Sequence, residues 1–196
     1  MSNGKKIGFV FIPGFADWEY GFLAAAGADW FDFKPVSLSP RGEKVFGISG
    51  FSLSPQRSTD PGENADLDGI AVIGSDTWTS DAAPDVAPLL KAVAARGGVV
   101  GGICAGTVAL ARAGLFDGVA HTSNGRDWLA QNAPDYSGAA GYRDVPHAIA
   151  DGRIVSAPGS APGTFAQKFL LTLYPKKADM LAEMKSMFGR EYAEGS

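Results

Sequence analysis

The chain has 196 residues, of which 45% are hydrophobic and 19% are charged, a balance that excludes an intrinsically disordered protein. The formal net charge of −4 and the single cysteine argue against an electrostatic nucleic-acid or membrane-surface binder and permit no internal disulfide. We therefore expect one soluble cytoplasmic domain over residues 1–196, with no nucleic-acid or membrane partner.

In the first half of the chain, apolar runs alternate with helical patterns. Three apolar runs are predicted as buried strands: Ile7–Ile12, Gly69–Ile73 and Val99–Ile103. Phe31–Leu38 is predicted as a further strand from its apolar residues Phe31, Phe33, Val36 and Leu38. Helices are predicted from Asp17 towards Ala26, over Pro84–Arg96, and directly after Cys104. Between them, Val45–Leu53 is expected to form short strands or a hairpin, and Ser54–Glu63 a loop.

The second half is expected to hold shorter elements. Strand pieces are predicted at Val119–Thr122, Tyr142–Val145 and His147–Ile149, and Gly125–Gln131 is compatible with a helix. The dipeptide Asp151-Gly152 predicts a tight hairpin between Ala148–Ala150 and Arg153–Ala157. Helices are predicted over Thr164–Leu173 and from Pro175 onward. The alternation as a whole predicts an α/β fold: a three-layer α/β/α sandwich around a mostly parallel sheet.

The lone cysteine lies in the pattern Gly102-Ile103-Cys104-Ala105-Gly106, between a predicted strand and a predicted helix. This is the cysteine counterpart of the G-x-S-x-G nucleophile elbow, in which flanking glycines leave room for a sharp turn. The position at a helix N-terminus predicts a lowered thiol pKa and a reactive thiolate. The alternative is that Cys104 is a small buried hydrophobic residue.

Two further places can contribute to a site at the carboxyl ends of the strands. Asp17 and Glu19 either neutralise the dipole of the first helix or place one carboxyl in the crevice beyond the first strand. His121 is either structural or site-lining, whereas His147 is interpreted as a surface or hydrogen-bonded histidine. No spacing of His, Cys, Asp or Glu indicates a metal site, and we expect no cofactor.

Three motifs together resemble the ThiJ/PfpI family: the elbow G-G-I-C-A-G-T, the sequence Asp17-Trp18-Glu19 after the first strand, and the turn G-S-D-T-W that starts at Gly74. This family belongs to the flavodoxin-like, class I glutamine-amidotransferase-like superfamily, which includes a deglycase linked to parkinsonism and isocyanide hydratase. The resemblance covers residues 7–169.

The resemblance implies roles for individual residues. Cys104 matches the family's reactive cysteine, and Glu19 matches the acid that hydrogen-bonds its sulfur. The backbone N–H groups of Ser75 and Ala105 would form an oxyanion hole, if the backbone angles tolerate serine where relatives have glycine. Further pocket residues are expected at the turn and in the H-T-S-N segment: Gly74, Trp78, Thr122, Ser123 and Asn124. In the deglycase branch a histidine follows the elbow helix, and His121 falls about one residue from that place.

Departures from the family pattern narrow the expected chemistry. Ala105 stands where the intracellular-protease branch has a histidine, so peptidase activity is not expected. No His-Pro-Glu element follows the hairpin, which argues against glutamine amidotransferase activity. The hypothesis is a cysteine-dependent hydrolase, hydratase or lyase acting on a small electrophilic molecule. The resemblance also implies a homodimer, and the terminal helices offer apolar surface for such a contact.

Two alternatives remain. In the first alternative, the chain is a non-enzymatic sensor of oxidative stress or a protein that protects against it, and its Cys104 is oxidised to the sulfinate. Or it is a ligand-binding or structural module that inherited the elbow as part of its scaffold.

Overall fold

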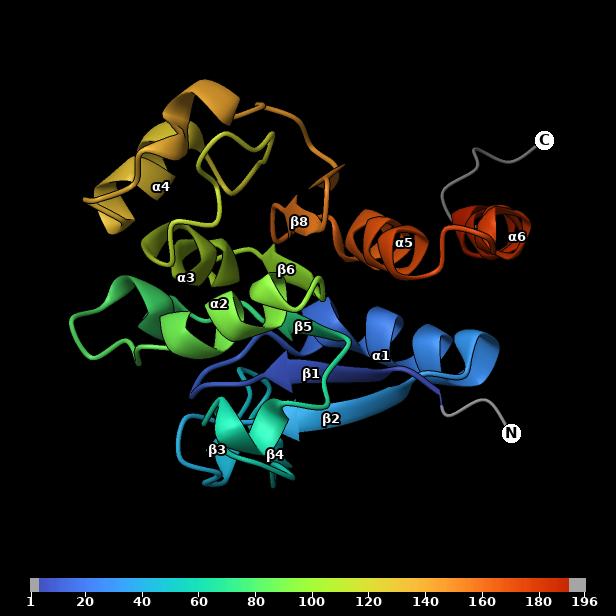
Figure 1. Ribbon diagram of the computed structural model, residues 1–196, viewed down its shortest axis with the longest axis horizontal. Coiled ribbons are helices and arrows are strands. Elements are labelled where there is room, and N and C mark those ends of the chain that lie inside the picture. The colour runs from blue at the N-terminus through green and yellow to red at the C-terminus, as the bar shows by residue number, and fades with distance from the viewer. Residues whose placement is uncertain (1–3, 191–196) are drawn as a thin grey trace.

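A computed structural model describes residues 4–190 of the chain and has a six-stranded sheet at its centre (Figure 1). The strand order is β2-β1-β5-β6-β8-β7; the pairing of β7 with β8 is antiparallel and the other four pairings are parallel. The strands of this sheet are β1 (Lys6–Val10), β2 (Lys34–Leu38), β5 (Gly69–Val72), β6 (Val99–Ile103), β7 (Ile149–Asp151) and β8 (Ile154–Ala157). Two short strands, β3 (Val45–Phe46) and β4 (Ser52–Leu53), form a separate hairpin.

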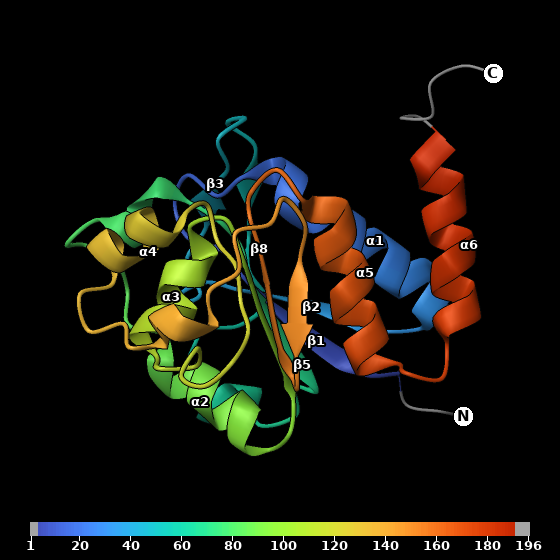
Figure 2. The same ribbon diagram turned by 90° about the horizontal axis from the view of Figure 1, so that it is seen from above.

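Helices cover both faces of the sheet, as Figure 2 shows with the sheet seen nearly edge-on. One layer is formed by α1 (Asp17–Phe31), α5 (Pro162–Leu173) and α6 (Ala178–Gly189). The other side holds α2 (Ala87–Ala95), α3 (Gly106–Arg112) and α4 (Arg126–Asn132). Three single 3-10 turns lie in the connections: η1 (Gly62–Asn64), η2 (Asp76–Thr79) and η3 (Gly138–Gly141). The predicted three-layer α/β/α architecture is confirmed.

Each layer of helices shares its own hydrophobic core with the sheet. The strand β6 separates the two cores, and two of its glycines let helices approach from both sides. A Cβ at Gly101 would lie 2.8 Å from the ring of Phe169 in α5, and one at Gly102 would lie 2.9 Å from Leu110 in α3. Because these two positions have no side chain, large side chains of both helix layers pack directly on the backbone of β6.

The second strand is shorter than the sequence predicts. Phe31 ends α1, and β2 begins at Lys34. Between them, Asp32 adopts the left-handed conformation with φ 55°, and its backbone N–H donates to the carbonyl of Gly27. Phe31 and Phe33 are both buried in the same core as the helix, so their hydrophobicity indicated burial correctly but not a strand.

The predicted strand pieces at 119–122 and 142–145 are reduced to one isolated bridge between His121 and Tyr142. The predicted hairpin around Gly152 is confirmed, with β7 and β8 as its arms and a φ of 56° at the glycine. The predicted helix at 84–96 starts later, at Ala87, and the last helix starts at Ala178 rather than at Pro175.

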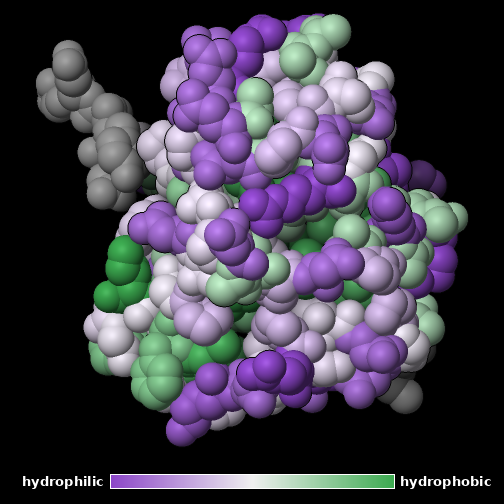
Figure 3. Space-filling view, turned by 90° about the vertical axis from the view of Figure 1, so that its left-hand side faces the viewer, coloured by the Kyte–Doolittle hydropathy of each residue, from purple (hydrophilic) through white to green (hydrophobic). Residues whose placement is uncertain are grey.

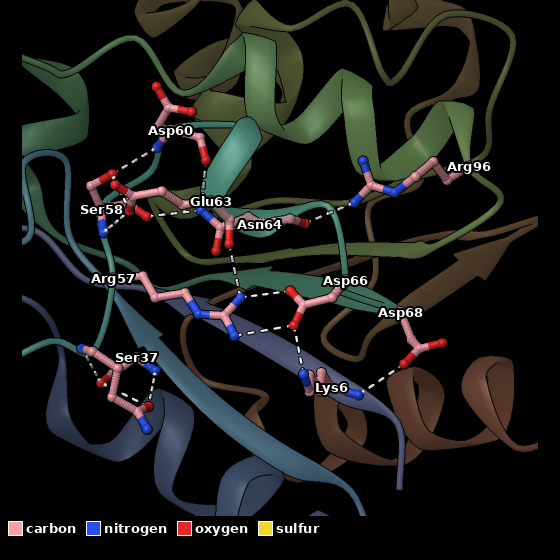
Figure 4. A network of polar contacts seen from close by, with 11 residues as sticks. Lys6, Ser37, Arg57, Ser58, Asp60, Glu63, Asn64, Asp66, Asp68 and Arg96 are labelled. Atoms are coloured by element: carbon pink, nitrogen blue, oxygen red, sulfur yellow. Dashed lines mark hydrogen bonds and ion pairs between the residues drawn. The ribbon is translucent and has the colours of Figure 1, made fainter. Parts of the chain in front are cut away.

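Opposite the carboxyl ends of the strands, a polar network fixes the loop that leads into β5 (Figure 4). Arg57 donates two hydrogen bonds to Asp66, at 2.6 and 3.1 Å, and the ammonium of Lys6 contacts the same carboxylate at 2.6 Å. The two cations hold the pKa of Asp66 well below its usual range. Arg96 donates to the carbonyl of Asn64, which ties the loop to the end of α2. These charges are paired with one another, so this end of the molecule has a structural role.

Within residues 4–190, no helix has the length and apolar content needed to cross a bilayer.

Two glycines near helix starts give a matched test of the packing. A Cβ at Gly106, the first residue of α3, would overlap the carbonyl oxygen of Val72, whereas one at Gly163 in α5 would meet nothing within 4 Å. We expect Gly106→Ala to lower the free energy of unfolding by about 2 kcal/mol or more, and Gly163→Ala to raise it by up to about 1 kcal/mol. Urea denaturation of both variants measures the difference, and equal stabilities would contradict the close approach of α3 to β5.

Candidate active site

Cys104 lies at the turn between β6 and α3. Its φ is 55°, in the left-handed region that residues other than glycine rarely adopt. The turn is held by main-chain contacts, because the N–H of Cys104 donates to the carbonyl of Ala157 at 2.9 Å and its carbonyl accepts from the Thr107 side chain. The thiol side chain is half-buried, between the two cores. This geometry is consistent with the predicted elbow.

A buried carboxyl faces the sulfur. Glu19, in the first turn of α1, is fully buried, and its Oε2 accepts a hydrogen bond from the N–H of Gly74 at 2.6 Å. Its Oε1 has no hydrogen-bond partner of regular geometry among residues 4–190. Gly74 lies between the acid and the cysteine: a Cβ there would be 2.5 Å from Glu19 Oε2 and 2.7 Å from the Cβ of Cys104. Glycine is therefore required at this position.

Glu19 and Cys104 both have a raised pKa, and burial is the main cause for each. Burial raises the pKa of Glu19 to about 7, opposed by its hydrogen bond from Gly74 and by Cys104. Burial, followed by the negative charge of Glu19, raises the pKa of the Cys104 thiol to about 11, opposed by the amide of Asn124 and the N–H of Ala105. The prediction of a lowered thiol pKa is wrong for this site. The reason is that the sulfur is partly removed from water and lies near a carboxyl, and these two effects outweigh the N–H groups at the start of α3.

Asp17, two residues before Glu19, has a different role. Its carboxylate accepts hydrogen bonds from the N–H and the hydroxyl of Ser49, at 3.0 and 2.7 Å. It thereby attaches the loop of the β3–β4 hairpin to the start of α1. Of the two acids in this turn, Glu19 lies at the sulfur.

Ser75 continues the turn after β5. Its backbone is extended, with φ −162° and ψ 142°, a conformation open to any residue, so serine fits where relatives have glycine. Its hydroxyl donates to the carbonyl of Pro13 at 2.6 Å and accepts from Thr77 N–H at 3.1 Å. The hydroxyl is thus engaged in the turn, and the group that Ser75 can offer to a substrate is its backbone N–H.

In the H-T-S-N segment, Asn124 reaches the sulfur: its Nδ2 lies 3.3 Å from Cys104 Sγ. Thr122 and Ser123 are buried instead. The N–H of Thr122 donates to the Ser156 hydroxyl at 2.8 Å, and the Ser123 hydroxyl pairs with that of Thr107 at 2.6 Å. These two residues hold the segment in place, and Asn124 is the one that contacts the nucleophile.

His121 is not among the groups that the structure brings to Cys104. The ring is fully buried, stacks on Phe116 with 4.1 Å between centroids, and uses both nitrogens, one with the carbonyl of Val119 at 2.7 Å and one with the hydroxyl of Tyr136. Burial lowers the pKa of His121, which favours the neutral ring. We therefore assign His121 a structural role and leave it out of the site.

Of the predicted pocket residues, Trp78 also lies elsewhere, whereas His147 was expected at the surface. Trp78 is buried in the core beside α2 and α3, where its indole N–H donates to the carbonyl of Ile73 at 2.8 Å. His147 is exposed. Among the described residues, no three side chains of His, Cys, Asp or Glu gather where they could hold a metal.

The sequence did not single out Gly159 and Trp18 as site residues. A Cβ at Gly159 would lie 2.7 Å from Cys104 Sγ and 3.3 Å from Glu19 Oε1. The carbonyl of Gly159 accepts from the indole N–H of Trp18 at 3.2 Å, and Trp18 is 55% exposed. The available signal was the Pro158-Gly159 pair, which follows β8, the strand next to the elbow strand.

Figure 3 shows the end of the molecule towards which β1 points in Figure 1. Hydrophobic residues gather at the lower left of this face, over the β3–β4 hairpin. Phe46, Ile48 and Phe51 of the hairpin are 56%, 64% and 77% exposed. The hairpin is bound to the segment before Glu19, because Gly14 N–H donates to the carbonyl of Phe46 at 2.8 Å. An apolar surface therefore adjoins the candidate site.

A family model described as the DJ-1/PfpI family matches residues 5–172. The chain belongs to the DJ-1/PfpI family. It is 32% identical over 192 residues to a Bacillus subtilis protein described as "Uncharacterized protease YoaZ", covering 93% of this chain and 87% of that relative.

Solved structures of the same superfamily are also similar. The DJ-1 superfamily protein Atu0886 from Agrobacterium tumefaciens is 34% identical, with a TM-score of 0.83, covering 94% of this chain and 99% of the other. A thiJ/pfpI family protein from Bacillus anthracis is 27% identical, with a TM-score of 0.78, covering 93% and 89%. The ThiJ/PfpI resemblance stated from the motifs is confirmed.

The coupling between the two acids predicts a pH dependence. Above pH 7 Glu19 ionises and opposes formation of the thiolate, so the neutral variant Glu19→Gln is expected to lower the thiol pKa of Cys104. Alkylation by iodoacetamide at pH 8 should be about tenfold faster in the variant, since more of the sulfur is ionised while each thiolate is somewhat less nucleophilic. Mass spectrometry of the alkylated chain gives the rate. Equal rates and identical pH profiles would show that the two groups are not coupled.

Proposed function

We propose that this DJ-1/PfpI family member is a cysteine-dependent enzyme, a hydrolase or a hydratase/lyase, that acts on a small electrophilic molecule. The observation that carries the proposal is the buried carboxyl of Glu19 facing a cysteine held at an elbow. An acid whose pKa is raised to about 7 gains and loses a proton near neutral pH. A purely structural carboxyl has no need of that property.

The proposed step begins with transfer of the thiol proton to Glu19. The sulfur attacks the electrophilic carbon of a carbonyl substrate, a C–S bond forms, and the electron pair of the C=O bond moves to oxygen. The N–H groups of Ser75 and Ala105 are proposed to stabilise the resulting oxyanion. Glu19 then gives this proton to the oxyanion or to the leaving group and becomes a carboxylate again. The C–S bond is broken afterwards, by attack of water in a hydrolase or by elimination of the thiolate in a lyase, and the sulfur regains a proton.

The site supports this chemistry better than peptidase chemistry. The residue after the nucleophile is Ala105, and the nitrogens of His121 are engaged with Val119 and Tyr136. Cys104 therefore has no histidine partner of the kind that cysteine peptidases use, and the proposal does not include the protease activity named for the Bacillus subtilis relative.

The alternative of an oxidation sensor is supported less well. Cysteines that sense peroxide combine a low thiol pKa with solvent access, whereas the Cys104 thiol pKa is raised and its side chain is half-buried. A transfer of the thiol proton to Glu19 during reaction avoids the need for a thiolate in the resting protein.

Turnover of α-oxoaldehydes, isocyanides and amides tests the proposal. Cys104→Ser is expected to lower kcat/KM for the accepted class at least a hundredfold, because the less acidic hydroxyl replaces the nucleophile. Glu19→Gln is expected to lower kcat as well, even though it speeds alkylation, because the proton carrier is lost. Thermal unfolding of each variant shows whether the fold is intact. Turnover in Cys104→Ser equal to that of the unaltered protein would disprove the assignment.

We also propose that the chain forms a homodimer, as the sequence suggests. Two exposed apolar surfaces are available, one on the terminal helices with Leu171, Met187 and Phe188, and one on the β3–β4 hairpin. The hairpin residues are the more exposed, and burial in an interface is the common explanation of such a patch.

Light scattering coupled to size-exclusion chromatography distinguishes the two surfaces. The unaltered chain is expected to have twice the monomer mass, and Phe51→Glu or Phe188→Glu should convert it to a monomer according to which surface is buried, because a buried unpaired carboxylate is costly. A monomeric unaltered chain at micromolar concentration would contradict the dimer.

A further inference from the structure

Gly159 is held from both sides by side chains that are distant in the sequence. Its N–H donates to Asn124 Oδ1 at 3.0 Å, and its carbonyl accepts from Trp18 Nε1 at 3.2 Å. The same Asn124 amide contacts Cys104 Sγ at 3.3 Å through Nδ2. Both backbone polar groups of Gly159 are thus bound by side chains, and one of these side chains, Asn124, also contacts the nucleophile.

The backbone at Gly159 forms one wall of the site. A Cβ there would be 2.7 Å from the sulfur and 2.9 Å from the Cβ of Cys104, so the chain passes closer to the thiol than any side chain allows. The turn around it is closed by a hydrogen bond from Ala161 N–H to the carbonyl of Pro158 at 3.0 Å, directly before α5. The wall is therefore attached to a helix of the main core.

The contacts fix the orientation of the Asn124 amide. A carboxamide has one accepting end and one donating end, and a rotation of its plane by half a turn exchanges them. The N–H of Gly159 can only donate, so it requires Oδ1 on its side, and Nδ2 then points at the sulfur. Gly159 in this way determines that Asn124 offers the sulfur a donor.

We infer that Trp18, Gly159 and Asn124 act as a clamp in which Asn124 is the neutral hydrogen-bond donor to the sulfur of Cys104 and Trp18 is a positioning residue. The inference rests on the proposed function, since it assigns these residues to the nucleophile of that reaction. The inference adds to the proposed function that the uncharged amide of Asn124 stabilises negative charge on the sulfur. The titratable group that faces the sulfur is Glu19 from α1, whereas Asn124 and the N–H of Ala105 are neutral donors.

Alkylation of Cys104 by iodoacetamide, followed from pH 6 to 11, tests the clamp without any turnover assay. Asn124→Asp replaces the donor by a carboxylate of the same shape, and we expect the alkylation profile to move up by about one pH unit, with a rate about tenfold lower at pH 8. Trp18→Phe keeps the ring but removes the indole N–H, and should shift the profile in the same direction by a smaller amount. Asn132→Asp is the matched control, since that amide donates to the carbonyl of Trp128 within α4; its profile should not move.

A double variant shows whether the two side chains act through Gly159. Trp18→Phe in the background of Asn124→Asp is expected to add nothing, because the amide that Trp18 positions is already gone. The inference is overturned if Asn124→Asp leaves the profile unchanged, or if the effect of Trp18→Phe is the same in both backgrounds. Because alkylation needs no substrate, a failure of the proposed enzyme activity leaves this result intact, and the two failures are distinguishable.

Discussion

The contact on which the site depends is the 2.6 Å hydrogen bond from the backbone N–H of Gly74 to the buried carboxylate oxygen of Glu19. It joins α1 to the end of β5. The carbonyl of Gly74 is also bound, because it accepts a hydrogen bond from Ala16 N–H at 2.9 Å. The elbow after β6 lies against this junction. The C-terminal ends of the neighbouring strands β1, β5 and β6 therefore meet at the side chain of Glu19. Any side chain at Gly74 would separate them. The position of the sulfur relative to the acid is therefore a consequence of main-chain packing.

The same contact decides the charge at the site. One backbone hydrogen bond is too little to offset the desolvation of a fully buried carboxylate, so the pKa of Glu19 rises to about 7. A negative charge there in turn disfavours a thiolate beside it. Two acids that share a small volume give up their protons in two separate steps, and the first belongs to the pair as a whole. Between these steps the site holds one proton, on the sulfur, beside an ionised carboxylate that can accept it, which suits a reaction that must remove a proton from sulfur and then return it.

The sequence predicted the backbone better than the contacts between side chains. Continuous apolar runs identified β1, β5 and β6 because parallel strands buried on both faces need them. The strand prediction failed at Phe31 and Phe33, where apolar residues alternate with charged ones; both are buried at the end of α1 without belonging to a strand. Cys104 could be found from its flanking glycines, and Glu19 by the family resemblance. Gly159 could not, since its contact with the sulfur joins residues 55 positions apart in the chain, and no local pattern encodes such a distance. His121 lies on an irregular segment, so no strand or helix period predicts where its side chain points. In the structure the ring points into an aromatic cluster and away from the site.

The two ends of the sheet differ in how their polar groups are satisfied. At the amino ends of the parallel strands, Asp66 is surrounded by Arg57 and Lys6 and its charge is stabilised. At the carboxyl ends, Glu19 is buried with one unpartnered oxygen among the described residues, and Cys104 adopts a left-handed backbone conformation that costs on the order of 1–3 kcal/mol in a residue with a Cβ. Selection for stability alone would remove both features. The backbone of Gly74 and Gly159 approaches Cys104 closely, and the carbonyl of Ala157 binds its N–H. An arrangement so constrained holds the nucleophile ready before any substrate arrives.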